Sequence, residues 1–433
     1  MMLKIYEASE NIKFLDELNK RTNANYKEVY KVVEEIIEDV KLKQDEALFR
    51  YTEKFDRAKL TTLEVTKEDM KKAFDRLDGN LLKTLTKAHN NIKDYHERFV
   101  KKSMTYKLNG ENIVLGQIIT PIEKVGIYIP GGKAAYPSTV LMNAVPAKIA
   151  GVKELVMVTP PDAQGKIKDS ILAAAYIAGV DRVFSLGGAQ AIAALAFGTE
   201  SVPKVYKITG PGNLYVASAK KLVSDFVGID MIAGPSEILI IGDKFSNPKY
   251  IAADLISQAE HDEMAAVILV TDSPRLAREV NKALEKMTEQ MDRKEIIKKA
   301  INNYGAVIIT NSLEESIGIA NEIAPEHLEI ATRNPFEDYK KIKNAGAIFL
   351  GEYTPEPVGD YFAGPNHTLP TSSTSKFSSA LSVDDFIKKT SLLYYSKEAL
   401  KDYEEDIVRF ANDEGFTGHA NAIKVRFEGE IND

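Results

Sequence analysis

The sequence predicts an α/β protein built on two similar, doubly wound parallel sheets. From about residue 121, short apolar runs typical of buried strands alternate with helical stretches, and the same alternation begins again after Gly234. Strands that alternate with helices along a chain form parallel sheets whose two faces are covered by the helices. We therefore expect a first α/β unit over residues 121–234 and a second over residues 235–380.

Apolar runs of strand length mark the expected strands of both units. In the first unit they are Val125–Ile129, Glu154–Pro160, Val183–Gly188 and Val205–Asn213, the last two running into glycine turns. In the second unit they are Glu237–Asp243, Ala265–Asp272, Ala306–Thr310 and Ala345–Gly351. We expect helices between these strands, including one that ends at Gly151, because glycine is a common residue at a helix C-cap.

Both ends of the chain are predicted to be helical. The N-terminal stretch is charged, and its apolar residues from Val29 to Val40 fall at the spacing of one helix face. We expect residues 1–120 to form a helical region that packs with the second α/β unit, and residues 381–433 to form a polar helical tail. We expect His89 and His96 to be solvated helix residues.

The composition excludes several classes of protein. The chain has 433 residues, of which 44% are hydrophobic and 27% charged, as is ordinary for a globular protein with two or three domains. Its net charge of -7 argues against nucleic-acid binding as the main function, because phosphate binding needs a basic face. No apolar run approaches the roughly 20 residues of a membrane-spanning helix, and the N-terminus lacks a signal-peptide pattern. We therefore expect a soluble, cytoplasmic protein that binds neither nucleic acid nor membranes.

The absence of cysteine restricts any metal site. Disulfides and thiolate ligands are impossible, so a metal ion must be bound by histidine, carboxylate or amide side chains. Each pair of a histidine and a nearby oxygen-bearing side chain is alone more often structural, but together such pairs offer nitrogen and oxygen donors that suit zinc or a similar divalent ion. The pairs are Gln258 with His261, Glu326 with His327, Asp360 with His367, and Glu414 with His419.

Glycine-rich loops indicate a second candidate site. The loops are Gly131-Gly132, Gly187-Gly188, Gly210-Pro211-Gly212 and Gly234-Pro235-Ser236. None matches the G-x-G-x-x-G fingerprint of dinucleotide-binding proteins or a phosphate-binding P-loop, and each alone is more often a simple turn. Loops that follow parallel strands meet at the carboxyl edge of a sheet, where ligands bind. Four such loops at the same edge therefore predict a ligand crevice.

A series of motifs in a fixed order resembles that of histidinol dehydrogenase. The motifs are Pro-Gly-Gly within Tyr128–Lys133, GGAQA at 187–191, GPGN at 210–213, AGPSE at 233–237, SQAEHD at 257–262, APEHLE at 324–329, GDYFAGPNHTLPT at 359–371 and EGFTGHANA at 414–422. The resemblance extends from about residue 30 to about residue 425, and it shows no departure at the positions that match the family's functional residues.

The resemblance implies an NAD-dependent enzyme that oxidises L-histidinol to L-histidine through bound L-histidinal, in the last steps of histidine biosynthesis. It also implies Rossmann-like domains, one Zn²⁺ per subunit, and a homodimer in which the tail of one chain completes the active site of the other. The implied zinc ligands are Gln258, His261, Asp360 and His419. His327 is the implied general base, and Glu326 the implied activator of water. The implied substrate contacts are Ser236, His367 and Glu414 together with the metal ligands, Glu326 and His327. The implied NAD contacts are Tyr128, Gln190 and Asn213.

The chemistry of these residue types agrees with the implied roles. Oxidation of an alcohol needs a base that takes the hydroxyl proton as hydride leaves, and histidine is neutral and basic near pH 7. The second oxidation needs water added to an aldehyde, and a carboxylate beside the base, such as Glu326, can activate that water. Because the amine and imidazole of histidinol are themselves zinc ligands, the metal would anchor the substrate.

The sequence leaves two other functions open. One is oxidation of another small polar primary alcohol, which the zinc and NAD residues alone would not distinguish, although Glu414 and His367 match the histidinol pattern. The other is a non-catalytic nucleotide- or metal-binding protein on the same scaffold. Such a protein would have lost Glu326 or His327, and both are present.

Overall fold

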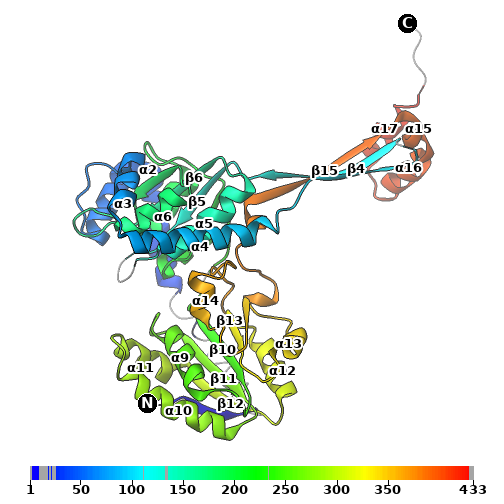
Figure 1. The fold of residues 1–433 in the computed structure, drawn as a ribbon. Helices are drawn as coiled ribbons and strands as arrows, with labels where there is room; N and C mark the ends of the chain where they lie inside the picture. Colours follow the sequence, from blue (N-terminus) through cyan, green and yellow to red (C-terminus); the bar gives the residue numbers. More distant parts are fainter. Residues whose placement is uncertain are drawn as a thin grey trace. The chain divides into compact units, whose positions relative to one another are not determined.

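The computed structural model describes residues 2–8, 18, 21, 26–110, 112–131, 135–232 and 234–428. The chain divides into two compact units. The first comprises Met1–Val100 and Ile122–Phe386, and the second comprises Lys101–Pro121 and Ile387–Asp433. Among the described residues, the first unit holds two six-stranded sheets and the second holds one three-stranded sheet (Figure 1). The described helices include no candidate for a membrane span.

The two sheets of the first unit share one strand order. The first sheet runs β2 (Glu64–Val65), β7 (Arg182–Ser185), β6 (Glu154–Thr159), β5 (Lys124–Tyr128), β8 (Lys207–Thr209) and β9 (Gly228–Ile229). The second sheet runs β1 (Lys4–Glu7), β12 (Gly305–Ile309), β11 (Ala266–Thr271), β10 (Glu237–Gly242), β13 (His327–Ile330) and β14 (Ala347–Leu350).

Each sheet therefore has a parallel core with its strands in the chain order third, second, first, fourth and fifth. A strand from the N-terminal region flanks each core: β1 pairs in parallel with β12, and β2 pairs antiparallel with β7. The strand order reverses between β5 and β8 in the first sheet and between β10 and β13 in the second. This is the doubly wound arrangement, so the predicted fold class is confirmed.

Helices cover both faces of the first sheet. One face packs against α2 (Tyr26–Asp56), α7 (Gly188–Phe197) and α8 (Leu214–Val223). The other packs against α3 (Lys67–Arg76), α4 (Gly79–Glu97), α5 (Pro137–Ala150) and α6 (Asp169–Ile177). Because neighbouring side chains of a strand point to opposite faces, Val156 and Val158 of β6 join the first core and Leu155 and Met157 join the second.

The helices α2, α3 and α4 of the N-terminal region pack on the first sheet, so the expectation that this region packs with the second α/β unit is wrong for them. The predicted apolar face of α2, from Val29 to Val40, is buried in the same core as α7 and α8. The alanine-rich sequence of α7 explains this contact, since small side chains let a long helix approach closely. The strand β1 and Leu18, in contrast, belong to the second sheet and its core.

The two histidines of α4 differ in their surroundings. His89 is partly exposed, as expected. His96 is only 1% exposed and contacts the ring of Tyr95, so the expectation of a solvated side chain is wrong for this residue. Its Nε2 has no hydrogen-bond partner among the described residues. Burial lowers the pKa of His96 to about 4, which keeps the imidazole neutral at physiological pH.

Longer helices cover both faces of the second sheet as well. On one face lie α9 (Pro248–Ala259), α10 (Pro274–Thr288) and α11 (Lys294–Tyr304), and on the other lies α12 (Leu313–Ile323). The shorter elements are α13 (Pro335–Asp338), α14 (Glu356–Tyr361) and the 3₁₀ turns η2 (Tyr339–Lys341), η3 (Thr374–Lys376) and η4 (Val383–Phe386).

The second unit is built on an antiparallel sheet that the sequence did not predict. The strand β4 (Ile113–Pro121) lies between β3 (Met104–Leu108) and β15 (Ile387–Tyr395). These segments fall in residues 1–120 and 381–433, which we expected to be helical. That expectation is wrong for the three strands, although both regions also contain the expected helices. Pairing of β15 with β4 along its whole length, and the β-branched and aromatic residues of IKKTSLLYY, favour the strand. The helical part of the tail follows as α15 (Lys397–Asp402), α16 (Glu404–Asp413) and α17 (Thr417–Lys424).

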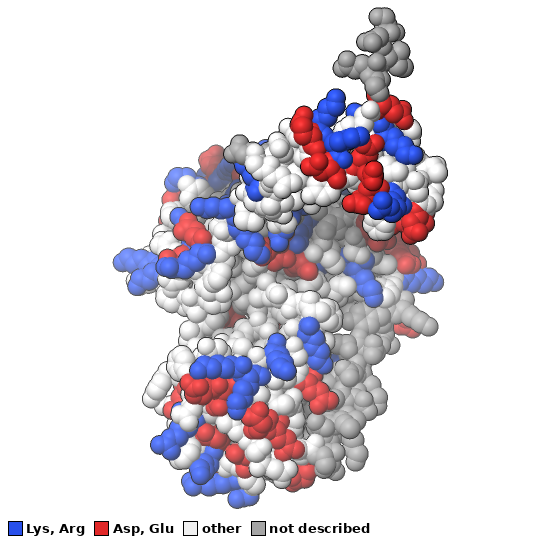
Figure 2. All heavy atoms as spheres, turned by 90° about the vertical axis from the view of Figure 1, so that its right-hand side faces the viewer, with Lys and Arg blue, Asp and Glu red and all other residues white. Residues whose placement is uncertain are grey.

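Acidic and basic side chains are intermixed on the face drawn in Figure 2. Neither the acidic nor the basic side chains form a broad continuous patch among the described residues of that face. Binding of a nucleic-acid backbone needs a basic patch or stripe, which this face does not offer.

Candidate active site

A cluster of titratable side chains lies at the amino edge of the second sheet. The strand β10 begins at Glu237 and β13 begins at His327, and the two strands pair with Ile238 opposite His327. The loop Gly234–Ser236 precedes β10 and so lies at this edge. We expected all four glycine-rich loops at one carboxyl edge. Gly234–Ser236 lies on the connection from β9 to β10 and directly precedes β10, so the expectation is wrong for the end of this loop, which lies at the amino edge of the second sheet.

The backbone of Glu237 contacts both members of the predicted catalytic pair. Its N–H donates to Oε2 of Glu326 at 2.9 Å, and its carbonyl accepts a hydrogen bond from Nδ1 of His327 at 3.1 Å. Because a carbonyl can only accept, Nδ1 carries the proton and Nε2 of a neutral ring keeps its lone pair. That Nε2 has no hydrogen-bond partner among the described residues and lies 3.7 Å from Oδ1 of Asp360.

A cavity of about 120 Å³ adjoins the histidine. His327, Asp360 and His367 line it, together with Phe349 and other apolar side chains. His367 donates from Nδ1 to the backbone carbonyl of Asp360 at 3.0 Å, and its Nε2 lies 3.3 Å from the hydroxyl of Thr139 on α5. Both hydrogen bonds fix the orientation of this ring.

Burial and crowding shift the proton affinities of the cluster. Burial raises the pKa of Glu326 to about 7 and the pKa of Glu356 to about 8. Burial works against a protonated His327, yet the carboxylates of Glu356, Glu326 and Asp360 outweigh it and raise the pKa of His327 well above its usual value. The site therefore holds an excess of buried acidic groups, which a cation placed among them would stabilise.

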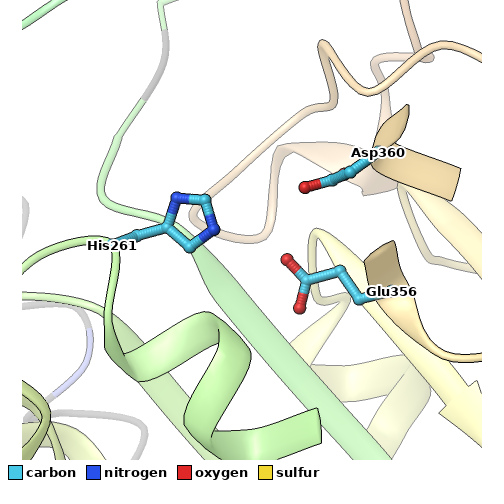
Figure 3. A group of neighbouring side chains, drawn as sticks. All are labelled: His261, Glu356 and Asp360. Atoms are coloured by element: carbon cyan, nitrogen blue, oxygen red, sulfur yellow. The ribbon is translucent and has the colours of Figure 1, made fainter. Parts of the chain in front are cut away.

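Three side chains of the cluster form a possible metal site. One donor atom each of His261, Glu356 and Asp360 all lie within 4.8 Å of one another. Figure 3 shows the imidazole of His261 facing the two carboxylates. Glu356 and Asp360 are four residues apart on α14 and so share a helix face, while His261 directly follows α9.

Gln258, on the last turn of α9, is fully buried beside this group. When its amide is oriented to satisfy both ends, the nitrogen donates to both carboxylate oxygens of Glu356, with 2.8 Å to Oε2. The amide oxygen then accepts from the N–H of Glu237 at 3.1 Å. Glu356 is thus a central member of the cluster that the sequence analysis missed. Its spacing of four residues from Asp360 was the available signal.

The other glycine-rich loops lie at the carboxyl edge of the first sheet, after β5, β7 and β8, although Gly132 falls outside the described residues. The hydroxyl oxygen of Tyr128 accepts from the N–H of Gly188 at 3.2 Å, and burial raises the pKa of Tyr128 to about 12. Gln190 is 1% exposed, yet neither atom of its amide has a hydrogen-bond partner among the described residues. Asn213 caps α8 by accepting from two backbone N–H groups.

A buried ion pair holds the loop that begins at Gly210. The side chain of Asp230 accepts from the N–H of Gly210 at 2.8 Å, and the ammonium group of Lys220 donates to the carbonyl of Gly210 at 3.1 Å. The side chains of Asp230 and Lys220 also contact each other. Gly210 has a φ of 110°, and a Cβ at this position would overlap the carbonyl oxygen of Tyr128. The sequence therefore needs glycine here for both conformation and space.

Two predicted residues lie in the second unit. Glu414 is the C-cap residue of α16, and His419 lies on α17 with its ring 5.2 Å from that of Phe416. Both are exposed in the single chain. Their roles, like those of Ser236 and the other implied site residues, stay predictions.

Comparisons with known proteins agree on one family. The sequence model of the histidinol dehydrogenase family matches residues 19–427. The histidinol dehydrogenase of Clostridium acetobutylicum is 54% identical over 417 residues, 96% of each chain, and that of Caldanaerobacter subterraneus subsp. tengcongensis is 52% identical over 98% of this chain and 99% of its own. The crystal structure of histidinol dehydrogenase from Elizabethkingia anophelis superposes with a TM-score of 0.93 at 37% identity and covers 98% of both chains. The chain belongs to the histidinol dehydrogenase family.

Proposed function

We propose that this protein oxidises L-histidinol to L-histidine in two successive NAD-dependent steps, the last steps of histidine biosynthesis. The observation that carries the proposal is the pair Glu326 and His327, buried at a small cavity beside a group of metal-ligating side chains. A non-catalytic protein of the same fold would have no need of a buried histidine whose Nε2 lacks a partner. We also propose that the protein acts in the cytoplasm.

His327 is suited to the role of general base in both steps. Its Nδ1–H is fixed on the carbonyl of Glu237, so Nε2 is the atom that can take the hydroxyl proton as hydride leaves the carbon. The surrounding carboxylates favour the protonated ring in the absence of other cations. A cation bound at the neighbouring group would oppose that effect and favour the neutral ring, which is the form a base needs.

Glu326 is suited to activate water in the second oxidation. A buried carboxyl group with a pKa of about 7 exchanges its proton readily near neutral pH. One of its oxygens is held by the N–H of Glu237, which fixes the side chain beside His327. The carboxylate can then take a proton from the water that adds to the bound aldehyde.

The donor set fits one Zn²⁺ per subunit. His261 offers a nitrogen and Asp360 an oxygen, in keeping with the N and O ligands that zinc accepts. Gln258 is buried beside them with its amide nitrogen toward Glu356 and its oxygen on the N–H of Glu237, so the amide would have to turn over to ligate the metal through oxygen. Bound there, zinc would anchor the amine and imidazole of the substrate. Glu356 either ligates the metal directly or holds the amide of Gln258. We propose that His367, Ser236 and Glu414 contact the substrate.

The carboxyl edge of the first sheet fits NAD. This edge lies at the switch point between β5 and β8, where doubly wound sheets bind nucleotides. The amide of Gln190 is buried and has no hydrogen-bond partner in the described part of the chain, which is costly unless a ligand supplies one. Tyr128, Gln190 and Asn213 are the proposed contacts. NAD would accept the hydride in each of the two steps.

We further propose a homodimer in which Glu414 and His419 complete the site of the partner. The second unit exposes apolar side chains, including Leu393 at 70% and Phe410 at 68%, and none of the residues of α16 is buried. Exposed apolar surface of this kind is typical of a protein interface. The helices α16 and α17, which hold Glu414 and His419, thus need a partner that covers their apolar side chains. We propose that this partner is a second copy of the chain.

Hybrid dimers test the shared site. Two inactive variants, His261→Asn and His419→Asn, are unfolded together, refolded and assayed. If His419 completes the partner's site, one site of each hybrid has both defects and the other has none. Random association makes about half the dimers hybrid, so about a quarter of wild-type activity returns. Hybrids detected by mass spectrometry without any activity would rule out the shared site.

The function itself is tested by NADH production from L-histidinol, with and without a chelator. We expect activity that falls on zinc removal and returns on zinc addition. The competing function within the same chemistry is oxidation of another small polar primary alcohol. A higher kcat/KM with such an alcohol than with L-histidinol would favour that function and overturn the proposal.

A further inference from the structure

Glu237 is buried beside the reacting pair, but its side chain takes no part in the proposed chemistry. Its backbone does the positioning. The N–H lies within hydrogen-bond distance of Oε2 of Glu326 and of the amide oxygen of Gln258, and the carbonyl holds Nδ1 of His327. A shift of this one peptide segment would therefore move the proposed base and the proposed water-activating group together.

The side chain of Glu237 is anchored by Arg21, which lies 216 residues earlier in the sequence. The guanidinium of Arg21 contacts the carboxylate of Glu237, and its Nη1 donates to the carbonyl of Met264 at 2.8 Å. Met264 lies in the turn that follows His261, where its own N–H bonds to Asp262. Arg21 is 4% exposed and lies over the ring of Tyr304. One buried cation thus joins the start of β10 to the turn after α9.

We propose that Arg21 is a positioning residue for the reaction and acts through Glu237. The inference rests on the proposed oxidation of histidinol. A buried carboxylate that loses its cation must move toward water or take up a proton, because an unpaired buried charge is costly. Either response displaces the peptide groups that orient Glu326 and His327. Displacements of about 1 Å at reacting groups can cost about 100-fold in rate.

The test compares Arg21→Met with a matched control. Arg182 forms a bidentate pair with Glu64 between β7 and β2 of the first sheet, with nitrogen–oxygen distances of 2.8 and 2.7 Å. This pair is partly exposed and contacts neither Glu326 nor His327. We expect Arg21→Met, assayed with saturating zinc, to lower kcat for both L-histidinol and L-histidinal by about 10- to 100-fold, with KM for NAD unchanged. We expect Arg182→Met to lower only the unfolding temperature.

A second pair of variants covers the case in which Arg21→Met does not fold. Arg21→Lys keeps the charge but cannot reach Glu237 and Met264 with a planar fork, so it should recover part of the lost kcat. Glu237→Gln keeps the shape and removes the charge, and it should lower kcat less than Arg21→Met. A wild-type kcat in folded Arg21→Met, or in both Arg21→Lys and Glu237→Gln, would overturn the inference. Inactivity of the wild-type protein itself would instead count against the proposed function.

Discussion

The two sheets of the first unit have the same strand order, but their candidate sites lie at opposite edges. In the first sheet Tyr128 is the last residue of β5, Gly188 follows β7 and Gly210 follows β8. In the second sheet Glu237 and His327 begin their strands. At the carboxyl edge of the second sheet lies an open depression of about 580 Å³, where Asp243 already accepts from the N–H groups of Phe245 and Arg333. Topology thus indicates the site of the first sheet but not that of the second.

The difference has a physical origin in the segments that lie against the amino edge of the second sheet. At the amino edge of the second sheet, α14 and the turn after α9 bring Glu356, Asp360 and His261 against the starts of β10 and β13. Buried carboxylates there need cations, and Arg21 neutralises one of them. The carboxyl edge of the first sheet instead presents backbone loops, neutral side chains and one ion pair, Lys220 with Asp230, whose charges compensate each other. One edge is suited to charge and proton transfer, and the other to a nucleotide.

Removal of the proposed base should give the largest effect. We expect His327→Gln to lower kcat for both oxidation steps by about 10²- to 10⁴-fold, because both steps need a base at Nε2. Glu326→Gln should slow oxidation of L-histidinal more than that of L-histidinol, because only the aldehyde step needs water. Single-turnover kinetics from each substrate measure the difference. Equal losses on both substrates for both variants would contradict this division of roles.

Zinc binding should show the next largest effect, and it should respond to substitutions at the second sheet but not to those at the first. His261→Asn should lose about 10- to 100-fold in zinc affinity with an unchanged melting curve, because His261 is exposed and contributes no core packing. Zinc binding should also weaken as the pH falls and the imidazole becomes protonated. Atomic absorption after dialysis measures the metal, with His89→Asn on α4 as the matched control. A variant with the full zinc content would remove His261 from the proposed ligands.

A substitution at the first sheet should change KM for NAD and leave zinc content unchanged. Gln190→Met fills the same buried space but removes the oxygen and the nitrogen of the side-chain amide. We therefore expect KM for NAD to rise about tenfold, which corresponds to the loss of one good hydrogen bond. Zinc content should stay at the wild-type value. Steady-state kinetics at varied NAD give the result. If zinc content fell while KM for NAD did not change, the assignment of separate ligands to the two edges would be wrong.

The sequence predicted the two sheets because their buried strands are continuous apolar runs separated by helical patterns. It did not predict β3, β4 and β15, whose pairing connects segments far apart in the chain and leaves many side chains exposed. The pairing of histidines with oxygen-bearing residues pointed to the segments around His261, His327 and Asp360. The contributions of Glu356 and Arg21 depend on contacts made only in the folded chain, so the linear pattern could not show them.

The smallest expected effect concerns a second buried histidine, whose surroundings contrast with those of His327. Carboxylates raise the pKa of His327, whereas burial lowers the pKa of His96 to about 4. Below the usual histidine pKa of about 6.5, the unfolded chain therefore binds a proton that the folded chain refuses, and stability is lost as the pH falls from about 6.5 toward 4. Between pH 7 and pH 5 the loss is about 2 kcal/mol.

His96→Phe keeps a ring in the same space and removes the titration. We expect its unfolding free energy to depend less on pH over this range than that of the wild-type protein, while zinc content and kcat at pH 8 stay unchanged. Denaturant unfolding at pH 7 and pH 5 measures the difference, and His89→Asn should behave like the wild-type protein. An equally steep loss of stability in His96→Phe would mean that other groups set the acid sensitivity. A loss of activity would mean that the helix layer of the first sheet is coupled to the reacting groups, which the separation of the two edges does not predict.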